Sequence, residues 1–243
     1  MKLIITEEQL RLIIENENKG RLLSLPIEMI DSPEKVEKIM ERYNEDKERR
    51  NFMGFNLIGS FNIGDYPELY DNHPFRELMK EVVSVRGDLI LNESSVSQLP
   101  KLRYVEGVLE LEETMTEELP SLVEVGGDLN VNYTFIDELP LLEKVGWLYL
   151  SDSAIKSLPK LREVTGTIRG SYSEIRFLPK LESVGGDANF FRSMIQDLPK
   201  LKYVGDKLFL DATPFGDKLR EMNLSDEEIK NKFGVNGHIN IWN

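Results

Sequence analysis

Seven hydroxyl-bearing residues recur at intervals of 19 or 20 positions, and such a series could supply nucleophiles. They are Ser94, Thr114, Thr134, Ser153, Ser173, Ser193 and Thr213. A nucleophilic hydroxyl needs a base beside it, and the chain has only two histidines. Six of the seven lie three residues after a large apolar residue, and Ser173 lies three after Gly170; at this point a chain leaving a strand turns and its backbone groups need partners. We therefore predict a structural column that hydrogen-bonds between neighbouring turns.

The other groups that could do chemistry are isolated. Asp128 and Asp187 each follow a Gly-Gly pair, and carboxylates that recur once per repeat do not converge on one ion as a calcium loop requires. His73 lies in an expected loop and His238 on an expected strand. Without cysteine there is no disulfide, thiolate nucleophile or cysteine zinc site. Because no catalytic motif appears either, we predict no catalytic residue, no metal site and no cofactor.

Aromatic residues occur at alternate positions of short apolar segments, on the face opposite the leucines. A core built from leucines does not require them there, and exposed aromatics are common anchors of interfaces. The alternatives are that the N-terminal helices cover this face or that the aromatics pack on one another. The residues predicted to bind a partner are Trp147, Tyr149, Arg169, Asn189, Phe191, Phe209 and Trp242.

A sequence repeat must position these residues. The pattern Leu-Pro-x-Leu-x-x-Val occurs six times, and its first leucines are 20, 20, 19, 20 and 20 residues apart. They are Leu99, Leu119, Leu139, Leu158, Leu178 and Leu198. A period near 20 residues predicts a solenoid whose coils bury their apolar faces against one another. The third copy is one residue short, at Val145-Gly146-Trp147.

One copy shows how a coil is expected to fold. Leu129 and Val131 alternate with polar residues, as in a half-buried strand. The proline of Leu-Pro fixes its own backbone angle and keeps the preceding leucine extended, which disfavours a helix on the return side. Glycines at Gly126-Gly127 and Gly185-Gly186 are expected to provide a positive φ where the chain enters the next strand.

The ends of the chain differ from the array. Thr6 with Gln9 resembles a capping box before a helix, and a second helix is predicted from a cap at Ser32 through Pro33 and Tyr43 to Arg50. The segment 218–233 is predicted to be helical, with a new N-terminus at Ser225. We expect four parts: a helical segment at 1–50, a divergent cap at 51–87, the array at 88–217, and a C-terminal cap with a helix and a final strand at 218–243.

Composition limits the partners. Charged residues make up 30% of the 243 positions and hydrophobic residues 40%, as in a globular protein. The net charge of −13 disfavours nucleic acid and anionic membranes, which require clustered positive charge, and is compatible with a basic protein partner. No signal peptide or stretch of about 18 apolar residues is visible, which predicts a cytoplasmic protein.

The repeat resembles the leucine-rich repeat in a short form of bacterial or viral type, over about residues 85–215. That resemblance implies a right-handed α/β-type solenoid with a parallel concave β-sheet, an irregular convex side and here an N-terminal helical appendage. Ser or Thr replaces the usual Asn of the family's turn, so no asparagine ladder is expected. Members mostly bind proteins, and the ubiquitin-ligase activity of some Leu-Pro relatives needs a cysteine that this chain lacks.

These observations favour a non-enzymatic module that binds a protein partner through the concave sheet. The alternative is a structural or assembly component that docks through its N-terminal helices or self-associates through its terminal strand at His238 to Trp242. Residues 1–15 resemble the start of some tailed-phage proteins, in line with a viral assembly component. An enzyme with a site on the concave face is a third class.

Overall fold

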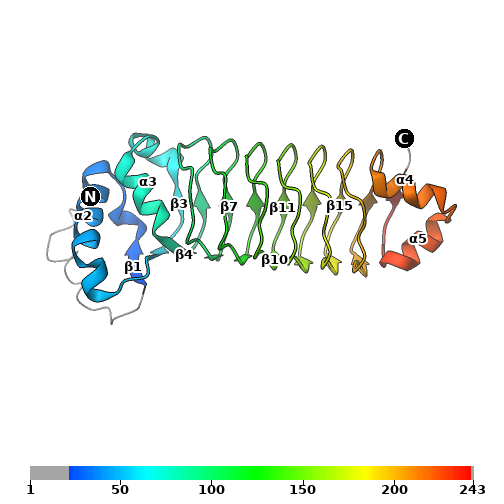
Figure 1. Cartoon of the computed structure of the whole chain (residues 1–243), viewed down its shortest axis with the longest axis horizontal. Coiled ribbons are helices and arrows are strands. Elements are labelled where there is room, and N and C mark those ends of the chain that lie inside the picture. The colour runs from blue at the N-terminus through cyan, green and yellow to red at the C-terminus, as the bar shows by residue number, and fades with distance from the viewer. Residues whose placement is uncertain (1–21, 242–243) are drawn as a thin grey trace.

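The computed structural model describes residues 22–241, apart from the side chains of residues 49 and 50. In this part of the chain two parallel sheets run the length of a solenoid (Figure 1). The expected capping box at Thr6 and the predicted contact residue Trp242 lie outside the described residues. Figure 1 shows the coils stacked in a nearly straight row between helices at the two ends.

Sheet A is the sheet whose strands, within the array, end in the valine of each repeat. Its order is β1 (Leu23–Pro26), β2 (Phe55–Ile58), β4 (Val82–Arg86), β6 (Tyr104–Val105), β8 (Glu124–Val125), β10 (Lys144–Val145), β12 (Glu163–Val164), β14 (Ser183–Val184) and β16 (Tyr203–Val204). The sequence analysis expected an irregular return side and did not predict this second sheet. Its strands are two residues long in the array.

Sheet B comprises the strands that carry the predicted binding residues. From the N-terminal end it contains β3 (Phe61–Asn62), β5 (Leu89–Ile90), β7 (Leu109–Glu110), β9 (Leu129–Asn130), β11 (Leu148–Tyr149), β13 (Ile168–Arg169), β15 (Ala188–Asn189), β17 (Leu208–Phe209) and β18 (Ile239–Asn240). Every pair is parallel and in register, so the inward residue of one strand lies beside that of the next. The predicted solenoid is confirmed.

The core is a stack of apolar residues contributed once per coil. Leu129 and Val131 are fully buried, and so are Leu139, Leu142 and Val145 of the same coil. Burying a Leu or Val side chain contributes about 1.5–3 kcal/mol, and in a solenoid that contact is made chiefly with the neighbouring coils. The alternation of the repeat therefore predicts correctly which side of each strand is buried.

The paired glycines do not have the expected positive φ. They are required because their Cα atoms approach the previous coil: a Cβ on Gly126 would lie 2.2 Å from the Glu106 carbonyl oxygen, and one on Gly185 would lie 1.9 Å from that of Thr165. Positive φ values occur instead at the residue before each hydroxyl. That column is Glu93, Glu113, Tyr133, Asp152, Tyr172, Arg192 and Ala212, with φ between 52° and 58°.

The hydroxyl column is structural, as expected, but its bonds run within a coil. All seven residues are buried. Thr134 Oγ1 donates to the Val131 carbonyl at 2.8 Å and Ser153 Oγ to the Leu150 carbonyl at 2.7 Å, closing the turn after the strand. Each of these hydroxyls reaches the carbonyl three residues earlier because the residue before it, which has a positive φ, reverses the direction of the chain within the turn. Burial excludes these hydroxyls as nucleophiles for a dissolved substrate.

A glycine at the left-handed position should stabilise the turn. Ala212 has φ 52° and an exposed side chain, so Ala212→Gly removes backbone strain at the cost of unfolded-chain entropy. We expect the free energy of unfolding in urea to rise by about 0.5 kcal/mol. Ala154→Gly, which changes the same residue type where φ is negative, should lower it by a similar amount; equal effects of the two substitutions would contradict this explanation.

The N-terminal end of the solenoid is closed by helices. The predicted helix is α2 (Pro33–Arg50); Ser32 occupies its N-cap position, but its side chain makes no capping hydrogen bond. Three 3-10 helices, at Ile27–Met29, Ile63–Asp65 and Pro67–Leu69, and α3 (His73–Lys80) complete this end. Strand β1 was not predicted: Leu23 and Leu25 alternate inward and extend sheet A beside β2.

A partly buried carboxylate joins these helices to the array. Glu81, the C-cap residue of α3, accepts a hydrogen bond from Tyr43 Oη of α2 at 2.8 Å, and from Lys47 Nζ at 2.6 Å. Lys101, in the first Leu-Pro turn, also donates to it. Burial raises and these three donors lower the pKa of Glu81, and the net shift is downward. Glu81 and its donors thus form a clamp between the cap and the first coil.

The C-terminal end is closed by α4 (Pro214–Glu221), α5 (Asp226–Phe233) and strand β18. The predicted N-terminus at Ser225 is confirmed: Ser225 and Glu228 form a capping box. The Arg220 guanidinium of α4 donates to the Ile241 carbonyl next to the last strand. That contact occupies an acceptor at the edge where another strand would add.

Candidate functional site

Apart from Trp242, which lies outside the described residues, the predicted binding residues lie on the outer side of sheet B. The register places Tyr149 beside Arg169, Arg169 beside Asn189, and Asn189 beside Phe209. Their inward neighbours are buried core residues, so these side chains point away from the core. The helices do not extend over this region, because Figure 1 places them at the ends of the array. One of the two alternatives raised by the sequence, coverage by N-terminal helices, does not hold for the described helices.

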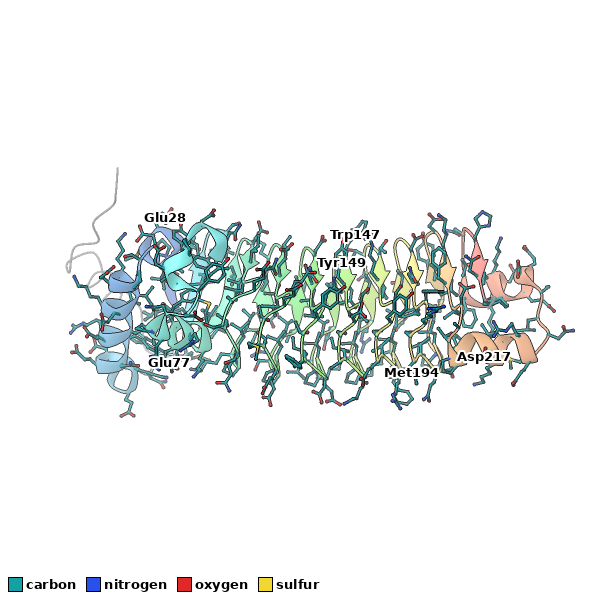
Figure 2. All side chains as sticks on the ribbon, turned by 90° about the horizontal axis from the view of Figure 1, so that it is seen from above. Glu28, Glu77, Trp147, Tyr149, Met194 and Asp217 are labelled. Carbon is teal, nitrogen blue, oxygen red and sulfur yellow. The ribbon has the colours of Figure 1, made fainter. Side chains whose placement is uncertain are left out.

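Two aromatic rings form the centre of this face. Trp147 is 39% exposed, and its ring stacks on that of Tyr149 with centroids 6.2 Å apart and planes 17° apart. Figure 2 shows both midway along the array, on a different side of the coil from Met194. The second alternative, packing of aromatics on one another, therefore holds in part, yet the pair leaves the Trp147 indole accessible.

A glycine that the sequence analysis did not single out sets the position of Trp147. The indole lies against Gly166 of the next coil, where a Cβ would be 2.2 Å from Trp147 Cδ1 and 2.3 Å from Nε1. Any larger residue would push the ring away from the sheet. The shortened third copy brings Trp147 into this register, since it replaces the Gly-Gly turn by Gly146 alone.

Charges of both signs flank the aromatic pair. The Arg169 guanidinium lies 5.5 Å from the Tyr149 ring centroid, in a cation–π contact. Burial, and after it the carboxylate of Asp128, raises the pKa of Tyr149, while Arg169 opposes that shift and Glu110 adds to it. In the register Asp128 directly precedes the strand next to Tyr149, and Glu110 lies one strand further along the same row. They belong to an acidic region that also contains Asp88 and Glu112.

The other predicted residues vary in accessibility. Phe191 and Phe209 are partly buried, and Phe191 packs edge-on against Tyr172 at 5.5 Å. Asn189 Oδ1 accepts hydrogen bonds from the Phe191 N–H and the Ser171 hydroxyl. Asn189 therefore stabilises the turn after its strand, and only Arg169 joins the aromatic pair as an exposed group.

Several polar residues on sheet B connect successive coils. Asp88 accepts from the Val108 N–H at 2.8 Å, Asn92 from the Glu112 N–H at 2.9 Å, and Asn132 from the Ser151 N–H at 2.8 Å. These bonds satisfy backbone donors that a two-residue strand leaves open. This structural role could not be predicted from the sequence, because it depends on the neighbouring coil.

The structure also exposes apolar side chains that were not predicted. Met115, Tyr133 and Phe135 are 57%, 54% and 63% exposed, on the turn edge that follows sheet B in the second and third coils. They lie directly before or directly after a residue of the hydroxyl column, and the repeat shows no preferred residue type at either of these two positions. The sequence feature that could have predicted this exposure is the presence of large apolar residues directly next to the hydroxyl column.

The two histidines lie at opposite ends of the solenoid, away from the Trp147–Tyr149 pair. His73 is not in a loop but begins α3, with its side chain 74% exposed, and His238 is exposed beside β18. Within residues 22–241 no group of three His, Cys, Asp or Glu side chains could hold a metal ion. A shallow groove over sheet A is lined by residues such as Asn56, Ser84 and Tyr104, and the Ser84 hydroxyl donates to Asn56 rather than to a base.

Two further findings concern the chain as a whole. Among the helices described here, none has the length and apolar character needed to cross a bilayer. Comparisons with protein-family models, with curated proteins and with solved structures found no match.

Proposed function

We propose that this chain is a non-enzymatic module that binds a basic protein segment across the outer face of sheet B. The observation that carries the proposal is the stacked Trp147–Tyr149 pair, with the carboxylate of Asp128 on the adjoining coil and that of Glu110 one coil further. An exposed indole offers apolar area at low entropic cost, and it is the residue type most enriched in binding hot spots.

The charge of the site favours a cationic partner. An arginine side chain that lies over the indole gains a cation–π contact and can reach a carboxylate with its guanidinium edge. Arg169 already covers one side of Tyr149, so the open position is over Trp147 and toward Asp128. The net charge of −13 steers such a partner toward the chain.

We also propose that the array is of the leucine-rich-repeat type. The recurring leucine columns, the Leu-Pro bend and the continuous parallel sheet support that assignment. The alternative function, assembly through the last strand, has less support, because Arg220 occupies the Ile241 carbonyl beside that strand.

Binding of defined peptides tests the function. In a Trp242→Phe background Trp147 is the single tryptophan and reports contact through its fluorescence. We expect a peptide that alternates Arg with Leu to change this emission at low salt, and a matched Asp-Leu peptide to leave it unchanged. Calorimetric titration should then show that Trp147→Ala/Tyr149→Ala weakens binding by about 100-fold, as expected for a hot-spot pair.

The matched control removes exposed apolar area elsewhere. Met115→Ala/Phe135→Ala truncates two exposed side chains on the turn edge, and it should leave the affinity for the Arg-Leu peptide within about twofold. Absence of binding by the unmodified chain would reject the proposal. So would a loss of affinity in the turn-edge variant that equals the loss in the aromatic variant.

A further inference from the structure

Charge is divided unevenly along the array. Residues 88–147 contain 13 Asp and Glu against 3 Lys and Arg, whereas residues 148–207 contain 7 against 10. The boundary lies at the middle of the solenoid, between the third and fourth coils. The two halves of one rigid element therefore carry opposite net charge.

On sheet A opposite charges are paired within the chain. Lys144 lies between Glu124 and Glu163 in the register, and its Nζ is 3.1 Å from Glu163. Lys202 Nζ is 3.0 Å from Glu182. Signs alternate from coil to coil there, so neighbours neutralise one another.

A different arrangement occupies the side of each coil just before the Leu-Pro bend. We call this the Leu-Pro column, defined by the residue two positions before each leucine of Leu-Pro. From the first coil to the sixth it consists of Ser97, Glu117, Asp137, Lys156, Arg176 and Gln196. In the same order, the side chains of the column are neutral, negative, negative, positive, positive and neutral.

The backbone fixes the spacing of this column. The Lys156 N–H donates to the Asp137 carbonyl at 2.9 Å, and the Arg176 N–H donates to the Lys156 carbonyl at 2.9 Å. Bridges between Glu138, Ser157 and Phe177 continue the same ladder one residue further. Successive side chains are therefore held about 4.8 Å apart and in register.

The charges of the column are not used inside the chain. Glu117, Asp137 and Lys156 are exposed, and among the described residues none of the four charged side chains of the column takes part in an ion pair. Glu117 lies beside Asp137 and Lys156 beside Arg176, so like charges are adjacent, which is unfavourable. A partner surface with positive charge opposite Glu117 and Asp137 and negative charge opposite Lys156 and Arg176 would offset both repulsions.

We propose that two copies of this chain associate antiparallel through their Leu-Pro columns. A two-fold axis between the third and fourth coils reverses the order of the column, so Glu117 meets Arg176 of the second copy and Asp137 meets Lys156. The contact is isologous, and all four charges of each copy find an opposite charge. This inference uses a different side of the coil from sheet B and does not depend on the proposed function.

Sedimentation velocity over a range of concentrations tests the association. The chain should form a dimer at low ionic strength and dissociate as salt rises, because the Debye length falls from about 10 Å at 0.1 M to about 3 Å at 1 M. Glu117→Lys/Asp137→Lys makes the column wholly positive, and Lys156→Glu/Arg176→Glu makes it wholly negative. Each variant alone should show a dissociation constant raised by about 100-fold, since it juxtaposes like charges.

Mixing separates this contact from a general effect of charge. A wholly positive column complements a wholly negative one, so the two variants mixed in equal amounts should form a heterodimer. Glu93→Lys/Glu113→Lys makes the same change in net charge on the turn edge, where both residues are exposed, and should leave the dimer intact. A monomer at every concentration in low salt, or failure of the mixture to associate, would overturn the proposal.

Discussion

Gly185→Ala should lower the free energy of unfolding by about 3 kcal/mol, in the upper range for overpacking. The added Cβ would lie 1.9 Å from the Thr165 carbonyl oxygen and 2.8 Å from its carbon. Both atoms belong to the backbone of the previous coil, so no side chain can rotate away. Relief requires that two coils separate, which weakens their shared core and the hydrogen bonds of sheet A.

Chemical denaturation with urea measures the effect. Gly64→Ala is the matched control, because its Cβ would meet no atom closer than 3.2 Å, and that atom is Asn62 Oδ1 of an exposed side chain. We expect the control to change stability by less than about 1 kcal/mol. Equal midpoints for the two variants would contradict the view that glycines at this turn permit close stacking of coils.

Glu81→Gln should destabilise the N-terminal cap by about 2 kcal/mol at neutral pH. The substitution removes the charge that Lys47 and Lys101 share and leaves the two ammonium groups close together. Lys47 and Lys101 are 35% and 36% exposed, so water compensates part of the loss and the cost stays below that of a fully buried pair. Hydrogen exchange of the α2 amides should accelerate more than that of the central coils, since a solenoid can lose an end repeat first.

The same clamp predicts a pH dependence. The pKa of Glu81 is lowered in the folded chain, so its contribution is fully present above the ordinary carboxyl pKa and is lost as the pH falls through the lowered value. The difference in stability between the unmodified chain and Glu81→Gln should therefore shrink in acid. Glu182→Gln is the control, because it breaks an exposed pair with Lys202 and should have no measurable effect. A difference that is the same at neutral and acid pH would contradict the clamp.

The sequence predicted the parts of the fold that repeat. A period of about 20 residues and the alternation at Leu129 and Val131 were sufficient for the solenoid, the buried face and the location of sheet B. The helix from Pro33 and the helix N-terminus at Ser225 have local signals and were also predicted correctly. Each of these depends on residues that are close in sequence.

What could not be predicted depends on contacts between coils. The role of Gly126 and Gly185 follows from the carbonyl of the previous coil, and the support that Gly166 gives to Trp147 crosses from one coil to the next. Sheet A was missed because the apolar positions around its strands, such as Leu142 and Val145, are three residues apart and do not alternate as Leu129 and Val131 do. The complementarity of Glu117 and Asp137 with Lys156 and Arg176 becomes visible only when the column is read in register.

The central claim is that the acidic, aromatic face of sheet B recognises positive charge. Its most direct test is the ratio of affinities for the Arg-Leu and Asp-Leu peptides, measured on the unmodified chain and on Glu110→Lys/Asp128→Lys. We predict that the unmodified chain prefers the Arg-Leu peptide by at least about tenfold and that the variant reverses this preference, because charge complementarity sets specificity. The same ratio for both proteins would contradict the claim.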